Sequence, residues 1–153
     1  NAGKSTLINT LTKSAVLVEN KLFATLDTKS ARLRFPRDTE AIITDTVGFI
    51  RDLPEELLAA FRATLDELHD ADLLIHVIDV SSRHFENHIA AVEKILEELS
   101  LNDKPVIRAF NKADLFADKS VLTSLSSRFD AVVISAFDKT TLYPLLEKIE
   151  ELV

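Results

Sequence analysis

The first residues of the chain are of the types, and in the order, that bind a chain of phosphates. Gly3, Lys4 and Ser5 form the second half of the pattern G-x-x-x-x-G-K-[ST], whose first glycine is absent from the sequence. A glycine lets backbone N–H groups approach phosphate closely, a lysine reaches the β- and γ-phosphate oxygens, and a serine hydroxyl ligates Mg²⁺. The alternative is a chance G-K-S at a solvated terminus.

The residues on either side extend this predicted phosphate loop. Asn1 and Ala2 precede the three residues and Thr6 follows them, and residues 6–11 read as the first turns of a helix. The N-terminal end of a helix carries a partial positive charge and unpaired N–H groups. We therefore expect that end of the helix to face the phosphates.

A second candidate motif, D-T-V-G, follows an apolar run. Its separation from Lys4 along the sequence is typical of phosphate-loop proteins. Asp45 is where a phosphate-loop enzyme places a carboxylate near Mg²⁺, either directly or through water. The N–H of Gly48 would then sense the γ-phosphate. A simple turn after an edge strand is the alternative.

A third motif, N-K-x-D, predicts which base is bound. The carboxylate of Asp114 can accept hydrogen bonds from guanine N1–H and N2–H₂, and adenine has neither donor. Asn111 would tie loops together and approach the base, and the stem of Lys112 would cover the base plane. Asp114 as a helix cap is the alternative. A position at the carboxyl end of a strand, where such sheets bind ligands, favours the functional interpretation.

The pair Ser135 and Ala136 follows the next predicted strand. The backbone N–H of Ala136 could bind guanine O6. Two residues alone carry almost no information, but their place one strand after N-K-x-D makes this role more plausible.

Apolar runs alternate with amphipathic stretches along the chain. Strands are predicted over residues 30–35, 40–45, 73–79, 105–110 and 131–134, and the first two form an antiparallel hairpin. Helices are predicted over residues 54–70, 86–99 and 140–153 from their apolar periodicity, with a short helix over 120–126. This alternation is typical of a three-layer α/β fold with a mostly parallel sheet and one antiparallel edge hairpin.

Composition narrows the classes of function. The net charge of −7 argues against broad binding of a nucleic-acid backbone. There is no cysteine, so neither a disulfide framework nor a thiolate metal site is expected. No apolar run approaches the roughly 20 residues of a membrane span. The cytoplasm is the expected location.

The motifs together resemble, in order and spacing, those of the Ras-like P-loop GTPases. Three further segments resemble the HflX family of translational GTPases: F-A-T-L-D-T at residues 23–28, D-T-V-G-F-I-R-D-L-P at 45–54 and L-L-A-A-F-R-A-T-L at 57–65. By that resemblance Thr25 is the switch threonine that closes on Mg²⁺ and the γ-phosphate, with Thr28 as the alternative. The resemblance implies a catalytic set of Lys4, Thr25 and Gly48, and a Mg²⁺ set of Ser5, Thr25 and Asp45.

On this interpretation residues 1–153 are one GTP-binding (G) domain, truncated within the phosphate loop. The family's N-terminal domain and helical linker are missing, and so is the strand that would precede Asn1. That strand normally lies in the middle of the sheet, so its absence would expose two sheet edges and an apolar groove. We expect the 153 residues alone to be unstable or to aggregate.

The residue after Gly48 bears on the rate of hydrolysis. Ras-type enzymes orient the attacking water with a Gln at this position, whereas this chain has Phe49, which forms no hydrogen bond through its side chain. We expect slow intrinsic hydrolysis that a partner accelerates. Arg51 is a candidate arginine finger, although a solvated switch residue or a partner contact is the simpler interpretation.

The sequence thus predicts a switch that binds Mg²⁺ and hydrolyses GTP to GDP. Resemblance to HflX implies the large ribosomal subunit as partner, mainly through domains absent here, and splitting or rescue of ribosomes as output. The protein is expected to be monomeric. One alternative is another bacterial GTPase of ribosome or RNA maturation, and another is a nucleotide-binding interaction module with negligible hydrolysis.

His84 and His88 have a spacing that suits a metal, but a solvated helix start is the simpler interpretation, and His76 reads as a core histidine.

Overall fold

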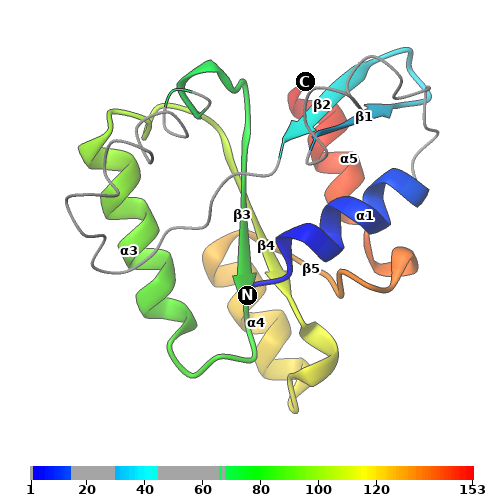
Figure 1. Cartoon of the computed structure of the whole chain (residues 1–153). Coiled ribbons are helices and arrows are strands. Elements are labelled where there is room, and N and C mark those ends of the chain that lie inside the picture. The colour runs from blue at the N-terminus through cyan, green and yellow to red at the C-terminus, as the bar shows by residue number, and fades with distance from the viewer. Residues whose placement is uncertain (1, 15–29, 45–65, 67) are drawn as a thin grey trace.

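The computed structural model describes residues 2–14, 30–44, 66 and 68–153 of the chain. From residue 74 onward its strands and helices alternate along the sequence (Figure 1). The strands are β1 (Ser30–Arg34), β2 (Glu40–Thr44), β3 (Leu74–Asp79), β4 (Val106–Asn111) and β5 (Ala131–Val133). The α-helices are α1 (Lys4–Ser14), α3 (Phe85–Glu98), α4 (Lys119–Phe129) and α5 (Tyr143–Leu152), and two short 3₁₀ helices are η1 (Ala113–Leu115) and η2 (Lys139–Thr141).

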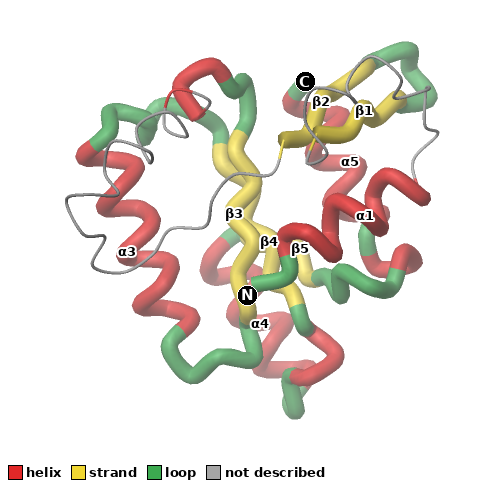
Figure 2. The backbone as a smooth tube through the Cα atoms, in the orientation of Figure 1, coloured by secondary structure: helices red, strands yellow, loops and turns green. Residues whose placement is uncertain are grey.

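The described strands form two sheets. In the larger sheet β3, β4 and β5 are parallel, with Leu74 opposite Val106 at the start of the first pair. In the smaller sheet β1 and β2 are antiparallel, and Figure 2 shows this hairpin set apart from the parallel strands. The prediction had the hairpin at the edge of a single sheet. Among the described residues no ladder joins β2 to β3, and a shared cluster of buried side chains packs the two sheets together.

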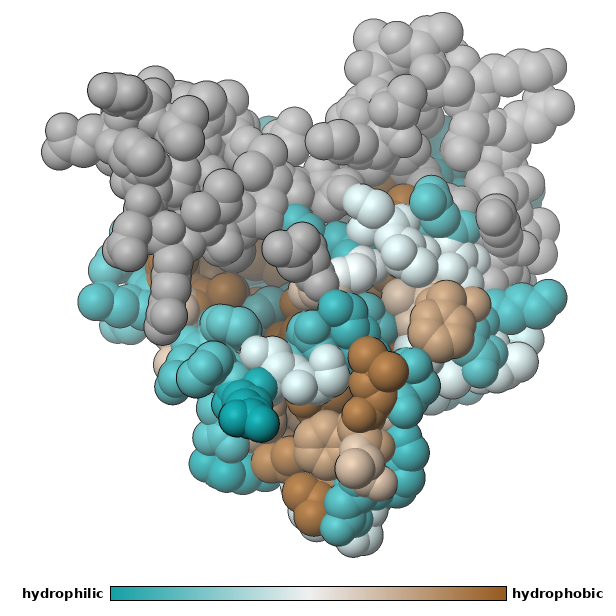
Figure 3. All heavy atoms as spheres, turned by 60° about the horizontal axis from the view of Figure 1, so that its bottom comes forward, coloured by the Kyte–Doolittle hydropathy of each residue, from teal (hydrophilic) through white to brown (hydrophobic). Residues whose placement is uncertain are grey.

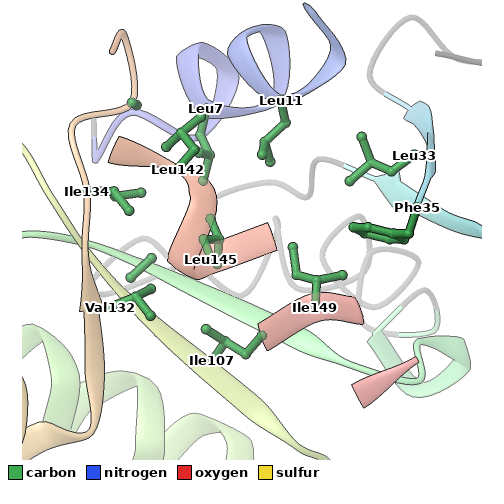
Figure 4. Close-up of a cluster of buried hydrophobic side chains, with 12 residues drawn as sticks. Leu7, Leu11, Leu33, Phe35, Ile107, Val132, Ile134, Leu142, Leu145 and Ile149 are labelled. Atoms are coloured by element: carbon green, nitrogen blue, oxygen red, sulfur yellow. The ribbon is translucent and has the colours of Figure 1, made fainter. Parts of the chain in front are cut away.

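One core holds the hairpin, the parallel sheet and two helices together. Figure 4 shows Leu7 and Leu11 of α1 facing the side chains of α5, β5 and β4, with Leu33 and Phe35 from the hairpin beside them. Leu33, Leu11 and Leu145 are almost completely buried. Burial of a large aliphatic side chain contributes about 1.5–3 kcal/mol, so this shared cluster attaches α1 firmly to the sheet.

A second core lies on the opposite face of the parallel sheet. It contains Ile78 and Phe110 from the strands, Ile89 from α3 and Leu122 from α4. Because neighbouring residues of a strand point to opposite faces, Ala109 belongs to the first core and Phe110 to the second. Helices therefore cover both faces of the sheet, which confirms the predicted three-layer α/β fold.

The helix predicted over 86–99 is α3, one residue earlier at each end, and two other predicted helices differ more from the structure. The short helix predicted over 120–126 is longer, because α4 starts after the side chain of Asp118 caps the N–H groups of Ser120 and Val121 and continues to Phe129. The helix predicted over 140–153 is divided. Asp138 caps the separate 3₁₀ turn η2 through Thr140, and α5 begins only at Tyr143.

Most of the helix predicted over 54–70 lies outside the described residues, and Asp66 and residues 68–70 within it are helical. The ammonium group of Lys104 donates to the carbonyl oxygens of His69 and Ala71, at 2.7 and 2.6 Å.

Within the described part of the chain, no helix is both long and apolar enough to cross a membrane.

Candidate functional site

The carboxyl ends of the parallel strands and the start of α1 meet at one end of the molecule. Asp79 ends β3 and Asn111 ends β4, and these two residues lie opposite each other in the sheet. Figure 1 places the start of the chain at this same end. Ligands of open α/β sheets bind beyond the carboxyl ends of the strands, so this end is the candidate site.

The side chain of Asn111 joins two loops that are far apart in the sequence. Its Nδ2 donates to the carbonyl oxygen of Ala2 at 2.7 Å, and its Oδ1 accepts from the N–H of Ala136 at 2.8 Å. The side chain is 2% exposed, so both hydrogen bonds are shielded from water. The prediction that Asn111 ties loops together is confirmed in geometry.

Gly3 has a structural role beyond the one predicted for it. Its backbone has φ +96°, and a Cβ at this position would lie 2.3 Å from Nδ2 of Asn111. A side chain would therefore collide with the amide that bridges the loops. The sequence predicted a glycine that lets phosphate approach, and the structure adds that Asn111 itself comes too close for any other residue.

The first turn of α1 borders a hollow in the surface. The hollow has a volume of about 380 Å³ and is lined by Gly3, Lys4, Ser5, Thr6 and Lys112. Two lysines thus face a space at the N-terminal end of a helix, where backbone N–H groups and the helix dipole favour an anion. The hydroxyl of Ser5 is an oxygen ligand of the kind that Mg²⁺ prefers, and the other two residues predicted to hold that cation, Thr25 and Asp45, lie outside the described residues.

Asp79 binds the ammonium group of Lys112. Lys112 Nζ lies 2.9 Å from Oδ2 of Asp79, and Oδ1 accepts from the N–H and the hydroxyl of Ser81. Burial by itself raises the pKa of Asp79, but the hydrogen bonds from Ser81 and Lys112 and the lysine charge outweigh it and hold this pKa below its usual value. The carboxylate is therefore charged at neutral pH and fixes where Lys112 extends from its left-handed backbone at φ 62°.

Asp114 is tied to the loop that carries Ser135. The hydroxyl of Ser135 donates to Oδ1 of Asp114 at 3.0 Å. Thr141 holds that loop in turn, because its hydroxyl oxygen accepts from the N–H of Ser135 at 2.9 Å and contacts the carbonyl oxygen of Ser135 at 3.1 Å. Asp114 itself is exposed. The alternative in which it caps a helix is not what the structure shows, since Asp118 caps α4.

The N–H of Ala136 has a different partner from the predicted one. It was expected to be available to guanine O6, and in the structure it donates to Asn111. Ala136 is buried, 3% exposed. Because β4 and β5 are neighbouring strands, the amide oxygen of Asn111 lies within hydrogen-bonding distance of the Ala136 N–H. If this N–H also donates to a base, its hydrogen must be shared between the base and the Oδ1 of Asn111.

Several predicted site residues lie outside the described residues. They are Asn1, the switch residues Thr25 and Thr28, the D-x-x-G residues Asp45 and Gly48, and Phe49 and Arg51. Their assignments stay predictions. Of the described site residues, Asn111 is hydrogen-bonded to Ala2 and Ala136, Ser135 to Asp114, and Lys112 to Asp79, and this network of hydrogen bonds lies beyond the ends of the strands.

Sequence reasoning missed Asp79 and Thr141. Asp79 had a usable signal, because it ends a buried strand next to the strand that ends in Asn111. Thr141 had no usable signal, because its contact depends on the turn at Asp138.

His84 and His88 are both exposed at the start of α3, and the residues that the structure describes contain no cluster of three or more metal-ligating side chains.

The fold and this network define a P-loop GTPase domain. Its architecture is that of a GTP-binding protein from Sulfolobus solfataricus solved in complex with GDP, which is 28% identical with a TM-score of 0.80 over 99% of this chain and 49% of that one. The family model described as 50S ribosome-binding GTPase matches residues 1–112, and the chain belongs to this family.

Curated relatives agree with this family membership. The chain is 45% identical to the GTPase HflX of Alkalihalophilus pseudofirmus over 151 residues, which is 99% of this chain and 35% of that protein. It is 49% identical to the GTPase HflX of Caldanaerobacter subterraneus over 150 residues, 98% of this chain and 34% of that protein. The chain thus spans about a third of the length of these relatives. The predicted resemblance to HflX is confirmed.

Proposed function

We propose that residues 1–153 form one guanine-nucleotide-binding domain, which hydrolyses GTP to GDP and phosphate and acts as a molecular switch. The observation that carries the proposal is the bridge made by Asn111 between Ala2 and Ala136. Through this one side chain the phosphate-loop motif and two base-recognition motifs meet at a single end of the sheet. A nucleotide requires that meeting, because its phosphates and its base belong to one molecule.

In this proposal the loop from Asn1 to Thr6 binds the phosphates. Lys4 contacts the β- and γ-phosphate oxygens, and backbone N–H groups of the first turn of α1 complete the contact. Ser5, together with Thr25 and Asp45, would hold Mg²⁺. Mg²⁺ held there would supply positive charge that offsets the negative charge developing on the phosphates.

The base would be read by the residues beyond β4 and β5. Asp114 accepts from guanine N1–H and N2–H₂, Asn111 and Ala136 lie beside the base, and Asp79 holds Lys112 in place. The hydrogen bond from Ser135 fixes one oxygen of Asp114, so the carboxylate is oriented before the base arrives. This arrangement favours guanine over adenine nucleotides.

Replacing Asp114 tests the choice of base. Asp114→Asn should lower affinity for GDP and raise the preference for xanthine nucleotides, because the amide offers a donor where xanthine has an oxygen. Asp118→Asn is the matched control, since Asp118 is also exposed and lies four residues further along the chain. It should leave both affinities as they are. An unchanged preference in Asp114→Asn would remove the guanine assignment.

We further propose that hydrolysis is slow until the protein binds the large ribosomal subunit. Two findings support this: the family description names 50S ribosome binding, and the relatives are HflX GTPases. Phe49 in place of the water-orienting Gln is the reason for expecting slow intrinsic chemistry. Opening and closing of the switch loops with GTP would then couple hydrolysis to ribosome association and to splitting or rescue of ribosomes.

The measurement is single-turnover GTP hydrolysis by the intact protein, alone and with purified 50S subunits. The proposal expects a clear acceleration, and equal rates would refute the role of the subunit. Arg51→Ala separates an arginine finger from a contact residue, because loss of a finger slows the stimulated reaction by orders of magnitude.

A nucleotide-binding module with negligible hydrolysis is the second candidate, and Phe49 is the observation that favours it. Multiple-turnover phosphate release in the presence of 50S subunits distinguishes the two. Sustained release supports the GTPase, and binding without release supports the module.

A further inference from the structure

Asp114 is an exposed residue whose carboxylate is held by a hydrogen bond from Ser135. Figure 3 looks onto the end of the molecule where the parallel strands finish, and polar and apolar side chains are interspersed over it. Exposed side chains change rotamer rapidly unless a neighbour fixes them. The orientation of Asp114 therefore depends on how firmly Ser135 itself is held.

Thr141, the last residue of η2, holds the backbone of Ser135. The N–H of Ser135 donates to the hydroxyl oxygen of Thr141 at 2.9 Å. That hydroxyl lies 2.7 Å from the carbonyl oxygen of Asp138 and 3.1 Å from that of Ser135. A hydroxyl has one hydrogen to donate, and the carbonyl of Asp138 is the nearer acceptor. Since Ser135 is 6% exposed, its N–H depends on this hydroxyl more than on water.

The position of Thr141 is set by the core. The next residue, Leu142, is completely buried and belongs to the cluster that contains Leu7 and Leu11 of α1. The turn η2 also packs against α1. The hydroxyl of Thr141 is therefore presented to Ser135 from a backbone that the packing of α1 keeps in place.

We propose that Thr141 is a positioning residue for the choice of base. By holding Ser135, it keeps the carboxylate of Asp114 in the orientation in which both oxygens can accept from guanine. This inference rests on the proposed function of Asp114 and needs no contact between Thr141 and the nucleotide. It assigns to η2 a part in specificity that its sequence does not indicate.

The ratio of affinities for GDP and IDP measures the orientation of Asp114. Guanine offers two donors to the carboxylate, N1–H and N2–H₂, whereas hypoxanthine, the base of IDP, lacks the 2-amino group. A carboxylate that is held in place gains from both donors, and one that rotates gains less from the second. A general loss of stability would weaken both nucleotides alike and leave the ratio unchanged.

The test is calorimetric titration of the intact protein and its Thr141→Val variant with both nucleotides. Valine has nearly the shape of threonine but lacks the hydroxyl. Affinity for GDP should fall about three- to tenfold and affinity for IDP by less than about twofold, so the ratio narrows. Thr141→Ser, which keeps the hydroxyl, should restore the ratio to within about twofold of the parent. Thr141→Ala takes the place of the valine variant if that variant shows no cooperative melt.

Two controls separate the hydroxyl of Thr141 from its surroundings. Thr140→Val removes the neighbouring hydroxyl, which donates to Asp138 Oδ1 at 2.7 Å, while the N–H of Thr140 still caps that oxygen. It should leave the ratio unaltered. In a Ser135→Ala background the hydroxyl that reaches Asp114 is absent, so Thr141→Val should narrow the ratio no further.

An unchanged ratio in folded Thr141→Val, equal narrowing in Thr140→Val, or the full effect of Thr141→Val in the Ser135→Ala background would each overturn the role of Thr141. These outcomes would leave the GTPase proposal intact. A parent protein that binds GDP no better than IDP would instead overturn the guanine assignment of Asp114 and this inference with it.

Discussion

Replacement of Gly3 by alanine should disturb the site through a collision that the structure specifies atom by atom. The backbone at this position has φ +96°, where a residue with a side chain is disfavoured by about 1–2 kcal/mol. The new Cβ would also lie 2.3 Å from Nδ2 of Asn111. That amide is held by two hydrogen bonds, so it can move only by breaking at least one of them.

The size of the effect follows from these two contributions. Asn111 is 2% exposed, and a buried polar group that loses its partner costs about 1–3 kcal/mol. Added to the backbone strain, Gly3→Ala should lower the free energy of unfolding by about 2–5 kcal/mol. This is a large fraction of the 5–15 kcal/mol that is typical of native proteins, and nucleotide affinity should fall with it.

A double-mutant cycle in urea denaturation isolates the collision. In an Asn111→Ala background the amide is absent, so Gly3→Ala should cost only the backbone strain of about 1–2 kcal/mol. The two substitutions should therefore be less than additive by about 1–3 kcal/mol. If Gly3→Ala costs the same in both backgrounds, the proposed contact with Asn111 does not limit this position.

Three further predictions concern single side chains. Ser135→Ala removes the hydroxyl that donates to Asp114 and should raise the dissociation constant for GDP about three- to tenfold in titration calorimetry. Asp79→Asn removes the charge that holds Lys112; this partly exposed pair contributes about 1 kcal/mol, so GDP affinity should fall several-fold and the loss should shrink at high salt. Burial, then the charges of neighbouring cations, lowers the pKa of His76 to about 4 from 6.5, so the unfolded chain binds a proton that the folded chain does not. Stability should therefore be complete above pH 6.5 and fall by up to about 3 kcal/mol as the pH drops to about 4.

Matched variants control these measurements. Asp118→Asn changes an exposed carboxylate outside the site, and asparagine caps a helix as well as aspartate does, so GDP affinity should be unaffected. Equal losses in Asp79→Asn and Asp118→Asn would contradict the role given to Lys112. His76→Gln should flatten the dependence of stability on pH below 6.5, and an unaltered slope would assign that dependence to other groups.

Most of the fold could be predicted because its periodicities are strong. The continuous apolar runs that became β3 and β4 contribute side chains to the cores on both faces of the sheet, and runs of this length are typical of strands and too short for most helices. The bounds of α4 and α5 could not be predicted as well, because Asp118 and Asp138 decide them through single capping hydrogen bonds. Whether the hairpin joins the parallel sheet was also beyond the sequence, since strand pairing depends on which edges meet in space.

In the candidate site, too, some features could be predicted from the sequence and others could not. Gly3, Lys4, Ser5, Asn111 and Asp114 could be identified from their motifs, because binding phosphate and guanine restricts residue type and order. The contacts that these residues make with one another and with neighbouring loops could not be predicted. Nothing in the sequence states that Asn111 would use both ends of its amide on Ala2 and Ala136.

By itself the sequence determined the class of ligand, because a few residue types in fixed order carry that chemistry. The tertiary structure decided how the motifs cooperate. It brought Asn111 so close to Gly3 that no side chain fits there, gave Lys112 a charged partner in Asp79, and tied Asp114 to the hydroxyl of Ser135. The physical reason is that these relations join residues from separate loops, and only the parallel packing of β3, β4 and β5 against α1 brings those loops to one end of the molecule.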